Sequence, residues 1–92
     1  MMTTMLCRCR VEDYEAWKKI FDSHAMAHRN AGLTLTNMWR STEEPNNIFF
    51  IFDVEDVEKA TSFINSEESV KAGKDGGVID GEYHFAKAVP GV

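Results

Sequence analysis

Hydrophobic and polar residues alternate along several stretches of this chain, and each alternation predicts a β-strand. Residues 4–11 form one apolar face and one partly basic face, and residues 33–41 alternate again with many β-forming residues. Residues 48–54 are apolar on both faces, which is typical of a central strand that is covered on both sides. Residues 78–89 predict a last strand. The polar turn at residues 43–47 joins the second and third strands as a hairpin.

The second strand carries Asn37 and Trp39. Successive side chains of a strand point to opposite faces, so strict alternation predicts that both share a face with Leu33 and Leu35.

A stripe of large residues over positions 13–32 predicts an amphipathic helix, around which the rest of the chain is organised. Asp13 can cap its first turn, and Gly32 stops it because glycine adopts the left-handed conformation without a Cβ clash. Two imidazoles, His24 and His28, lie one turn apart on or beside the apolar stripe, where a core helix usually carries leucine or isoleucine.

Two further helices follow the third strand. Asp56 begins a helix that extends to Asn65, and residues 67–74 predict a short one. The order β-α-β-β-α-β predicts a ferredoxin-like α+β fold, with a four-stranded antiparallel sheet in the order 4-1-3-2 and both main helices on one face. We expect residues 1–92 to form a single domain. The other face of the sheet exposes apolar side chains, so we expect a partner sheet to cover it.

Composition narrows the function classes. The chain has 92 residues and a formal net charge of −5, which opposes phosphate backbones, so we expect no nucleic acid as a partner. Its longest apolar run, residues 48–52, is far shorter than the roughly 20 residues that span a bilayer, and we expect no membrane partner. The N-terminus lacks the pattern of a secretory signal, which predicts a cytoplasmic protein.

Cys7 and Cys9 are the two cysteines of the chain. Alternate residues of one strand point the same way, nearly parallel, so the two thiols are badly placed to form a disulfide with each other. We expect small apolar core side chains in a reducing compartment. A Cys-x-Cys metal half-site is the alternative, and it lacks a second pair of ligands.

Short patterns spread over nearly the whole chain resemble one known superfamily. They are Arg8, Val11-x-Asp13-Tyr14-x-x-Trp17, Phe21-Asp22-x-His24, Arg29, Gly32, Arg40, Pro45-Asn46, Asp56-x-x-Lys59-Ala60-x-x-Phe63 and Gly77-Val78. Together they resemble small stand-alone dimeric α+β barrel proteins of the antibiotic-biosynthesis-monooxygenase-like superfamily, which includes uncharacterised and cyclase-like members. The resemblance implies a homodimer joined through the sheet faces into a dimeric α+β barrel.

The resemblance implies less about function than about fold, because the superfamily includes cofactorless oxygenases, isomerising enzymes, haem-degrading enzymes and proteins without known activity. Its cofactorless monooxygenases place polar residues and a tryptophan around a polyketide-like substrate. Asn37 and Trp39 offer these residue types.

Three interpretations stay open for the histidine pair. The spacing of His24 and His28 suits two metal ligands, but the intervening Ala25-Met26-Ala27 lacks the glutamate of a metalloprotease helix. Neutral core histidines are the second interpretation. We predict the third, that both are catalytic groups lining a pocket, with no metal and no cofactor.

Further side chains are predicted to bind a small organic ligand beside this pair. They are Tyr14, Trp17 and Phe21 on the helix, Asn37 and Trp39 on the second strand, and His84 on the last strand. Two functions stay open: a cofactor-independent monooxygenase- or cyclase-like enzyme acting on a small aromatic or polyketide-like compound, and a non-catalytic ligand-binding or regulatory homodimer. A cavity with converging polar groups favours the first, and an interior filled by side chains favours the second.

Overall fold

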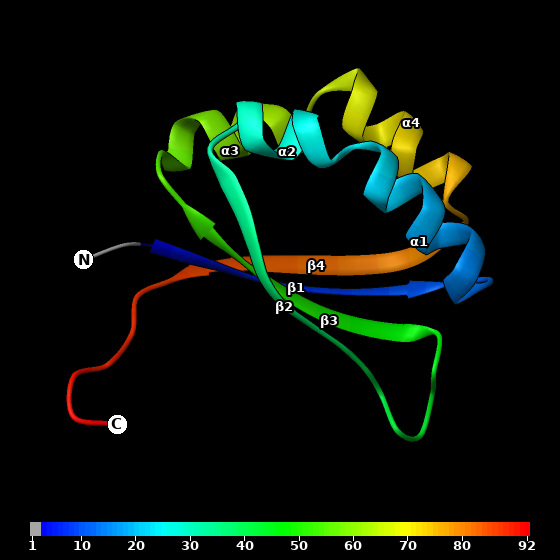
Figure 1. Cartoon of the computed structure of the whole chain (residues 1–92), viewed down its shortest axis with the longest axis horizontal. Coiled ribbons are helices and arrows are strands. Elements are labelled where there is room, and N and C mark those ends of the chain that lie inside the picture. The colour runs from blue at the N-terminus through cyan, green and yellow to red at the C-terminus, as the bar shows by residue number, and fades with distance from the viewer. Residues whose placement is uncertain (1–2) are drawn as a thin grey trace.

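The computed structural model describes residues 3–92 and confirms the predicted ferredoxin-like α+β fold. Its four antiparallel strands form an open sheet in the order β2-β3-β1-β4, and the helices cover one face (Figure 1). The elements are β1 (Thr3–Val11), α1 (Tyr14–Ser23), α2 (Ala25–Asn30), β2 (Leu33–Arg40), β3 (Asn47–Val54), α3 (Val57–Ile64), α4 (Glu67–Asp75) and β4 (Val78–Ala86).

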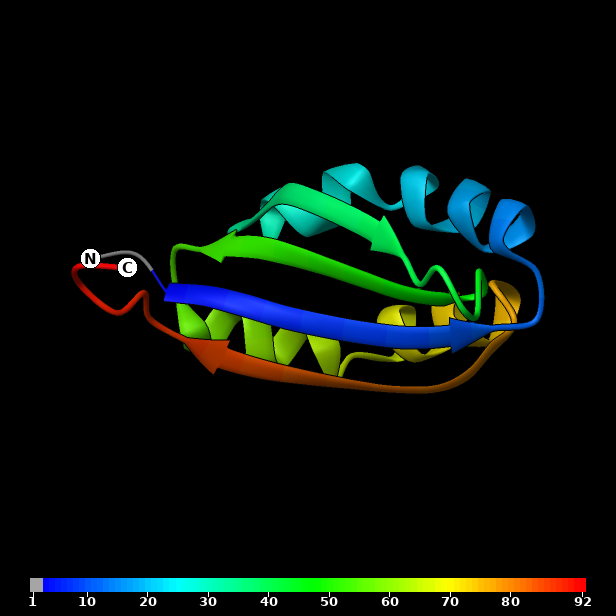
Figure 2. The same ribbon diagram turned by 90° about the horizontal axis from the view of Figure 1, so that it is seen from below.

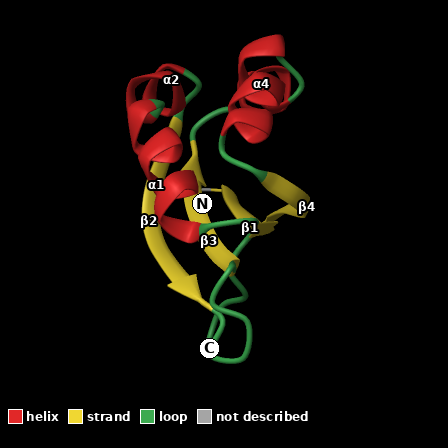
Figure 3. Ribbon diagram, turned by 90° about the vertical axis from the view of Figure 1, so that its right-hand side faces the viewer, coloured by secondary structure: helices red, strands yellow, loops and turns green. Residues whose placement is uncertain are grey.

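The helices stand over the sheet as two pairs. Helices α1 and α2 lie over the β2 side, and α3 and α4 lie toward β4 (Figures 2 and 3). The buried side chains between helices and sheet form two clusters: Met5, Ala31, Leu33, Phe52, Val54 and Ala60 near one end, and Cys9, Val11, Trp17 and Ile48 near the other. The helix side of the sheet therefore holds the core.

Local chemistry sets the helix ends as predicted. The Asp13 carboxylate accepts a hydrogen bond from the backbone N–H of Ala16, and the Asp56 carboxylate accepts from Glu58 and Lys59. Gly32 follows α2 with φ +75°, the left-handed conformation that favours glycine after a helix.

The first helix is not continuous, and here the prediction of one helix over residues 13–32 is wrong. At His24 the backbone turns to φ −100° and ψ 12°, which separates α1 from α2. The Ser23 hydroxyl donates to the Ile20 carbonyl at 2.6 Å, and the His24 ring binds the same oxygen at 2.9 Å. Side chains that bond nearby carbonyls compete with the helical hydrogen bonds, and the helix ends here.

A β-bulge at Thr36 corrects the predicted facing of the second strand. Leu35 lies opposite Phe52, but Asn37 lies opposite Ile51, so one residue of β2 has no partner. An extra residue shifts the alternation by one position, and every later side chain changes face. Asn37 and Trp39 therefore lie on the uncovered face, not with Leu35.

Strand β4 ends at Ala86, three residues before the predicted end. Ala86 pairs with Thr4, close to the start of β1, so the neighbouring strand offers almost no further backbone for pairing. The residues after Ala86 leave the sheet.

The uncovered face of the sheet combines an apolar band with an ionic network. Leu6, Phe49 and Trp39 are 45%, 41% and 51% exposed, as the two-sided apolar pattern of β3 predicts. Beside them, Arg8 contacts both Asp80 and Glu82, and Arg10 contacts Asp80. Within residues 3–92, no helix is long and apolar enough to cross a membrane.

Candidate functional site

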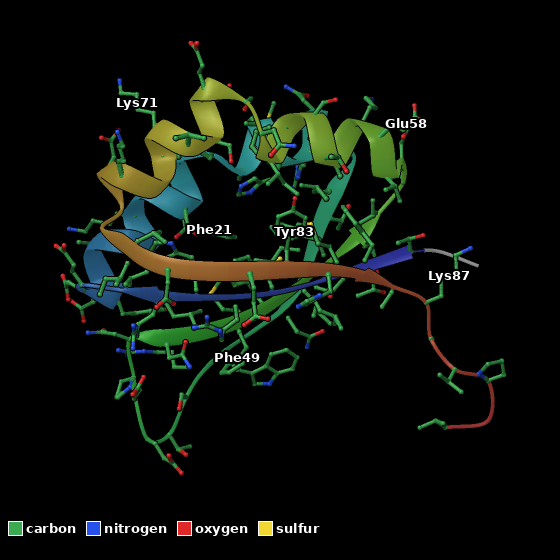
Figure 4. The ribbon with its side chains drawn as sticks, turned by 180° about the vertical axis from the view of Figure 1, so that it is seen from behind. Phe21, Phe49, Glu58, Lys71, Tyr83 and Lys87 are labelled. Carbon is green, nitrogen blue, oxygen red and sulfur yellow. The ribbon has the colours of Figure 1, made fainter. Side chains whose placement is uncertain are left out.

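A cavity of about 300 Å³ lies between the helices and the sheet. Its floor is formed by residues of β1, β3 and β4 that point to the helix side, including Cys7, Phe50 and Tyr83, and its walls include Phe21 and Phe63. Figure 4 shows Phe21 and Tyr83 between helices and sheet, with Phe49 on the opposite side. The interior is thus not filled by side chains.

A cluster of aromatic rings forms part of the wall of this cavity. The Phe21 ring centre lies 4.9 Å from that of Trp17, 5.4 Å from Phe50 and 4.9 Å from His28. The His28 ring also meets Phe63 edge to face at 5.7 Å, which connects α2 with α3 over the cavity. These tilted and edge-to-face contacts are the geometries that aromatic pairs favour, so the wall is well packed.

Two glycines shape the cavity. A Cβ on Gly76, after α4, would lie 3.1 Å from Cδ1 of the Trp17 ring, so this glycine lets α4 approach Trp17 closely. A Cβ on Gly81 would lie 3.0 Å from the Arg8 carbonyl oxygen and would point into the helix side of the sheet. Without a side chain there, the cavity reaches the backbone of β1 and β4.

His24 lies at the break between α1 and α2 and lines the cavity. Its Nδ1 lies 2.9 Å from the carbonyl oxygen of Ile20. A carbonyl oxygen can only accept a hydrogen bond, so Nδ1 carries the hydrogen, and in the neutral ring Nε2 is left with a lone pair. Within residues 3–92 this Nε2 has no hydrogen-bond partner. The geometry therefore leaves Nε2 as a proton acceptor.

His28 contributes a second imidazole to the same cavity. Burial lowers its pKa below the usual 6.5, and the neighbouring His24 lowers the pKa further. Both effects favour the neutral form of the His28 ring. No polar side-chain atom of the described residues is fully buried without a partner, so the free ring nitrogens reach accessible space.

The structure brings together four of the eight residues predicted for the site. Trp17, Phe21, His24 and His28 line the cavity. Tyr14 lies outside it, where the Arg40 guanidinium sits 3.9 Å from its ring centre.

The other three predicted site residues lie beyond the sheet. Asn37 and Trp39 lie on the uncovered face because of the bulge, and His84 lies there because it pairs with Leu6. The His84 side chain is 65% exposed and contacts Glu82. None of the three can reach a ligand in this cavity.

Several cavity residues were not predicted. Phe50, Phe63 and Tyr83 line the cavity and lie outside the predicted set of site residues. A signal for them existed: Tyr83 lies opposite Cys7 and Phe50 on the other side of it, so the antiparallel register places all three on one face.

Both cysteines are free thiols on the helix side of β1. Burial raises the pKa of Cys7 to about 12, with a smaller contribution from Cys9, and burial raises the pKa of Cys9 to about 11. A protonated thiol is a poor nucleophile, so neither residue is suited to attack a substrate. The described part of the chain contains no group of three or more His, Cys, Asp or Glu side chains that could hold a metal ion.

Known proteins are similar to this chain in fold but not in sequence. No family model matches the chain, and no curated protein matches its sequence. A candidate antibiotic biosynthesis monooxygenase from Bordetella bronchiseptica has a similar structure, with a TM-score of 0.77 and 17% identity over 96% of this chain and 97% of that one. A candidate antibiotic biosynthesis monooxygenase from Caulobacter crescentus has a TM-score of 0.73 and 14% identity over 96% and 90%.

A protein of the NIPSNAP family with unknown function, from Agrobacterium tumefaciens, is similar too. Its TM-score is 0.68, with 13% identity over 99% of this chain and 91% of that one. Sequence identities this low support a shared fold and nothing further. The fold that the sequence patterns implied is therefore confirmed, and the chain shares it with proteins that differ in what is known of their function.

The lowered pKa of His28 predicts a pH-dependent stability. Well above the ordinary pKa of 6.5, both the folded and the unfolded chain hold His28 neutral, and its contribution to stability is complete. As the pH falls, the unfolded chain binds the proton first, so this contribution is lost as the pH falls toward the lower pKa of the folded state. Denaturant unfolding of the wild type and His28→Phe should show the wild type losing free energy of unfolding relative to the variant between about pH 7.5 and about pH 5. A difference that does not change with pH would contradict this.

The raised pKa values of Cys7 and Cys9 predict that both thiols react slowly with a labelling reagent in the folded protein. At about pH 8 both cysteines should react with a maleimide at least about a hundredfold more slowly in the folded protein than in the unfolded one, because little thiolate is present. Unfolding without reductant should release two thiols per chain. Equal rates in the folded and unfolded protein would show that the thiols are not protected.

Proposed function

We propose that the protein is a small-molecule enzyme of the monooxygenase or cyclase type, which acts without a bound cofactor on an aromatic or polyketide-like compound in the cytoplasm. The supporting observation is an aromatic-lined cavity into which two imidazoles project between helices and sheet. Its volume of about 300 Å³ lies at the lower end of the roughly 300–1,000 Å³ of ligand sites, which favours compounds of one to three rings.

The proposed first step is a proton transfer. Nε2 of His24 takes a proton from a hydroxyl group, or from a carbon activated by a neighbouring carbonyl, and an electron-rich anion remains. In the monooxygenase case a carbon of this anion that still carries one hydrogen attacks dioxygen from solution, and the adduct is protonated to a hydroperoxide. The hydroperoxide then loses its outer oxygen, together with that last carbon-bound hydrogen, as water, and the carbon becomes a carbonyl. The substrate thus supplies all four electrons, one oxygen atom enters the product and the other leaves as water. In the cyclase case the anion attacks a carbonyl of the same molecule. The neutral His28 lies beside the imidazolium without adding a second charge.

We further propose that two copies of the chain pair through the uncovered faces of their sheets to form a dimeric α+β barrel. This face exposes Leu6, Phe49 and Trp39. A contiguous apolar surface of this kind on a small domain is typical of an interface. Arg8 lies at the border of these apolar side chains. Its ion pairs with Asp80 and Glu82 of the same chain already neutralise its charge.

His24→Ala should abolish turnover while the chain stays folded. Removing a general base costs about 10²–10⁴ in rate, and losing one hydrogen bond should weaken ligand binding by up to about tenfold. The assay measures dioxygen uptake and product formation with a panel of one- to three-ring phenols and anthrones, beside 2-naphthol binding by fluorescence. His84→Ala is the matched control, because this histidine lies on the other face of the sheet.

Thermal melting separates catalysis from a structural role. If His24 is a core residue, its truncation should mainly lower the free energy of unfolding, by about 1–3 kcal/mol. A large drop in melting temperature with unaltered 2-naphthol affinity would refute the assignment. A non-catalytic binding protein would lose affinity in His24→Ala but show no turnover in either form.

The dimer is tested by size exclusion with light scattering. We expect twice the chain mass at micromolar concentration, and a melting temperature that falls on dilution because association stabilises the folded state. Trp39→Lys should shift the mass toward the monomer, whereas Val70→Lys, an exposed apolar residue on α4, should not. A wild-type monomer whose stability is independent of concentration would contradict the proposal.

A further inference from the structure

A second hollow lies on the solvent side of the helices, directly above the cavity. It is a groove of about 830 Å³ between the α1–α2 break and the segment from α3 to the start of α4. Residues of both helix pairs line it, including Met26 and Ala27 on one side and Ser62 and Glu68 on the other. Figure 3 shows the two helix pairs standing apart over the sheet on this side of the molecule.

The groove and the cavity share two side chains, His24 and Phe63, which line both. His24 comes from the α1–α2 break, and Phe63 comes from the opposite helix, α3. These two residues therefore lie where the apolar interior and the groove meet.

The groove differs from the cavity in its chemistry. The carboxylates of Glu58 and Glu68 line it without an ion pair within residues 3–92, and the Asp56 carboxylate is occupied by backbone N–H groups. Lys59 is the one cationic side chain among the lining residues of the described chain. Glu58, Glu68 and Nε2 of His24 thus offer hydrogen-bond acceptors along the groove, where the two free carboxylates outnumber the single lysine.

We propose that the ligand is a two-part molecule, whose aromatic body of one or two rings fills the cavity and whose short chain passes between His24 and Phe63 to place a hydrogen-bond-donating group, above all an amine, in the groove. This inference rests on the proposed ligand site and adds to it the passage and the chemistry of the outer end. An acidic tail would meet carboxylates and a lone pair, so the site selects against arylalkyl acids.

Three naphthalene compounds with a two-carbon arm test the outer end: 2-(1-naphthyl)ethylamine, 2-(1-naphthyl)ethanol and 1-naphthylacetate. Calorimetry should rank the amine tightest and the carboxylate at least about tenfold weaker, with the alcohol between them. Raising the salt concentration should narrow the range, because the charges at the groove are exposed to solvent.

Methionine methyl groups report where each part of the ligand binds. Met5 lines the cavity, Met26 lines the groove, and Met38 lines neither. With ¹³C-methyl-labelled methionine, the amine should shift the signals of Met5 and Met26 and leave that of Met38 in place. Naphthalene, which has no arm, should shift Met5 alone.

Two double variants that reverse charges distinguish the effect of carboxylates in the groove on ligand preference from the effect of the net charge of the chain. Glu58→Lys with Glu68→Lys should abolish or invert the preference for the amine. Glu43→Lys with Glu44→Lys makes the same change in net charge at the β2–β3 turn, and it should leave the preference nearly unchanged.

Each result has one meaning. Binding of all the naphthalene compounds with equal affinity, or with no shift at Met26, overturns the two-part ligand and leaves the cavity as the site. Absence of binding by every compound, naphthalene included, overturns the proposed function and this inference together. An equal effect of both double variants shows that net charge alone causes the preference, and it overturns the role of the groove.

Discussion

The carbonyl oxygen of Ile20 accepts two side-chain hydrogen bonds, from the Ser23 hydroxyl and the His24 ring, and much of the site depends on this contact. It ends α1 at Ser23, about two turns before Gly32, where the predicted helix stops. The chain changes direction at His24, so α2 crosses above the cavity and brings His28 against Phe63 of α3. The same contact also holds the His24 hydrogen on Nδ1 and frees Nε2.

The sequence predicts the framework well where a local rule decides the outcome. Alternation identifies the four strands, and the caps at Asp13 and Asp56 have the bonds that their positions predict. Two of the features that the sequence did not predict have cooperative causes. The break at His24 requires Ser23 and His24 to bond one carbonyl together, and the bulge at Thr36 depends on pairing with Ile51, whose carbonyl lies 3.3 Å from the Thr36 hydroxyl. Neither position carries a glycine or proline to mark it.

The candidate site was predictable on the helix and much less so on the sheet. The spacing of Trp17, Phe21, His24 and His28 places them on one side, and the structure keeps them there. Tyr83 reaches the same cavity through pairing across β1, a long-range property that no single segment contains. The size of the cavity depends on how closely the two helix pairs approach each other over the sheet. The pattern of hydrophobic and polar residues does not determine this distance.

The sheet thus has two separate roles: its covered face forms the floor of an aromatic cavity, and its uncovered face is the proposed surface for a second chain. A crystal structure of the protein soaked with 6-bromo-2-naphthol tests this division most directly, because the anomalous signal of bromine locates the ring on one face or the other. Our account predicts bromine between helices and sheet, with the hydroxyl oxygen within hydrogen-bond distance of Nε2 of His24. Bromine bound beside Phe49 and Trp39 on the uncovered face, with the cavity empty, would contradict it.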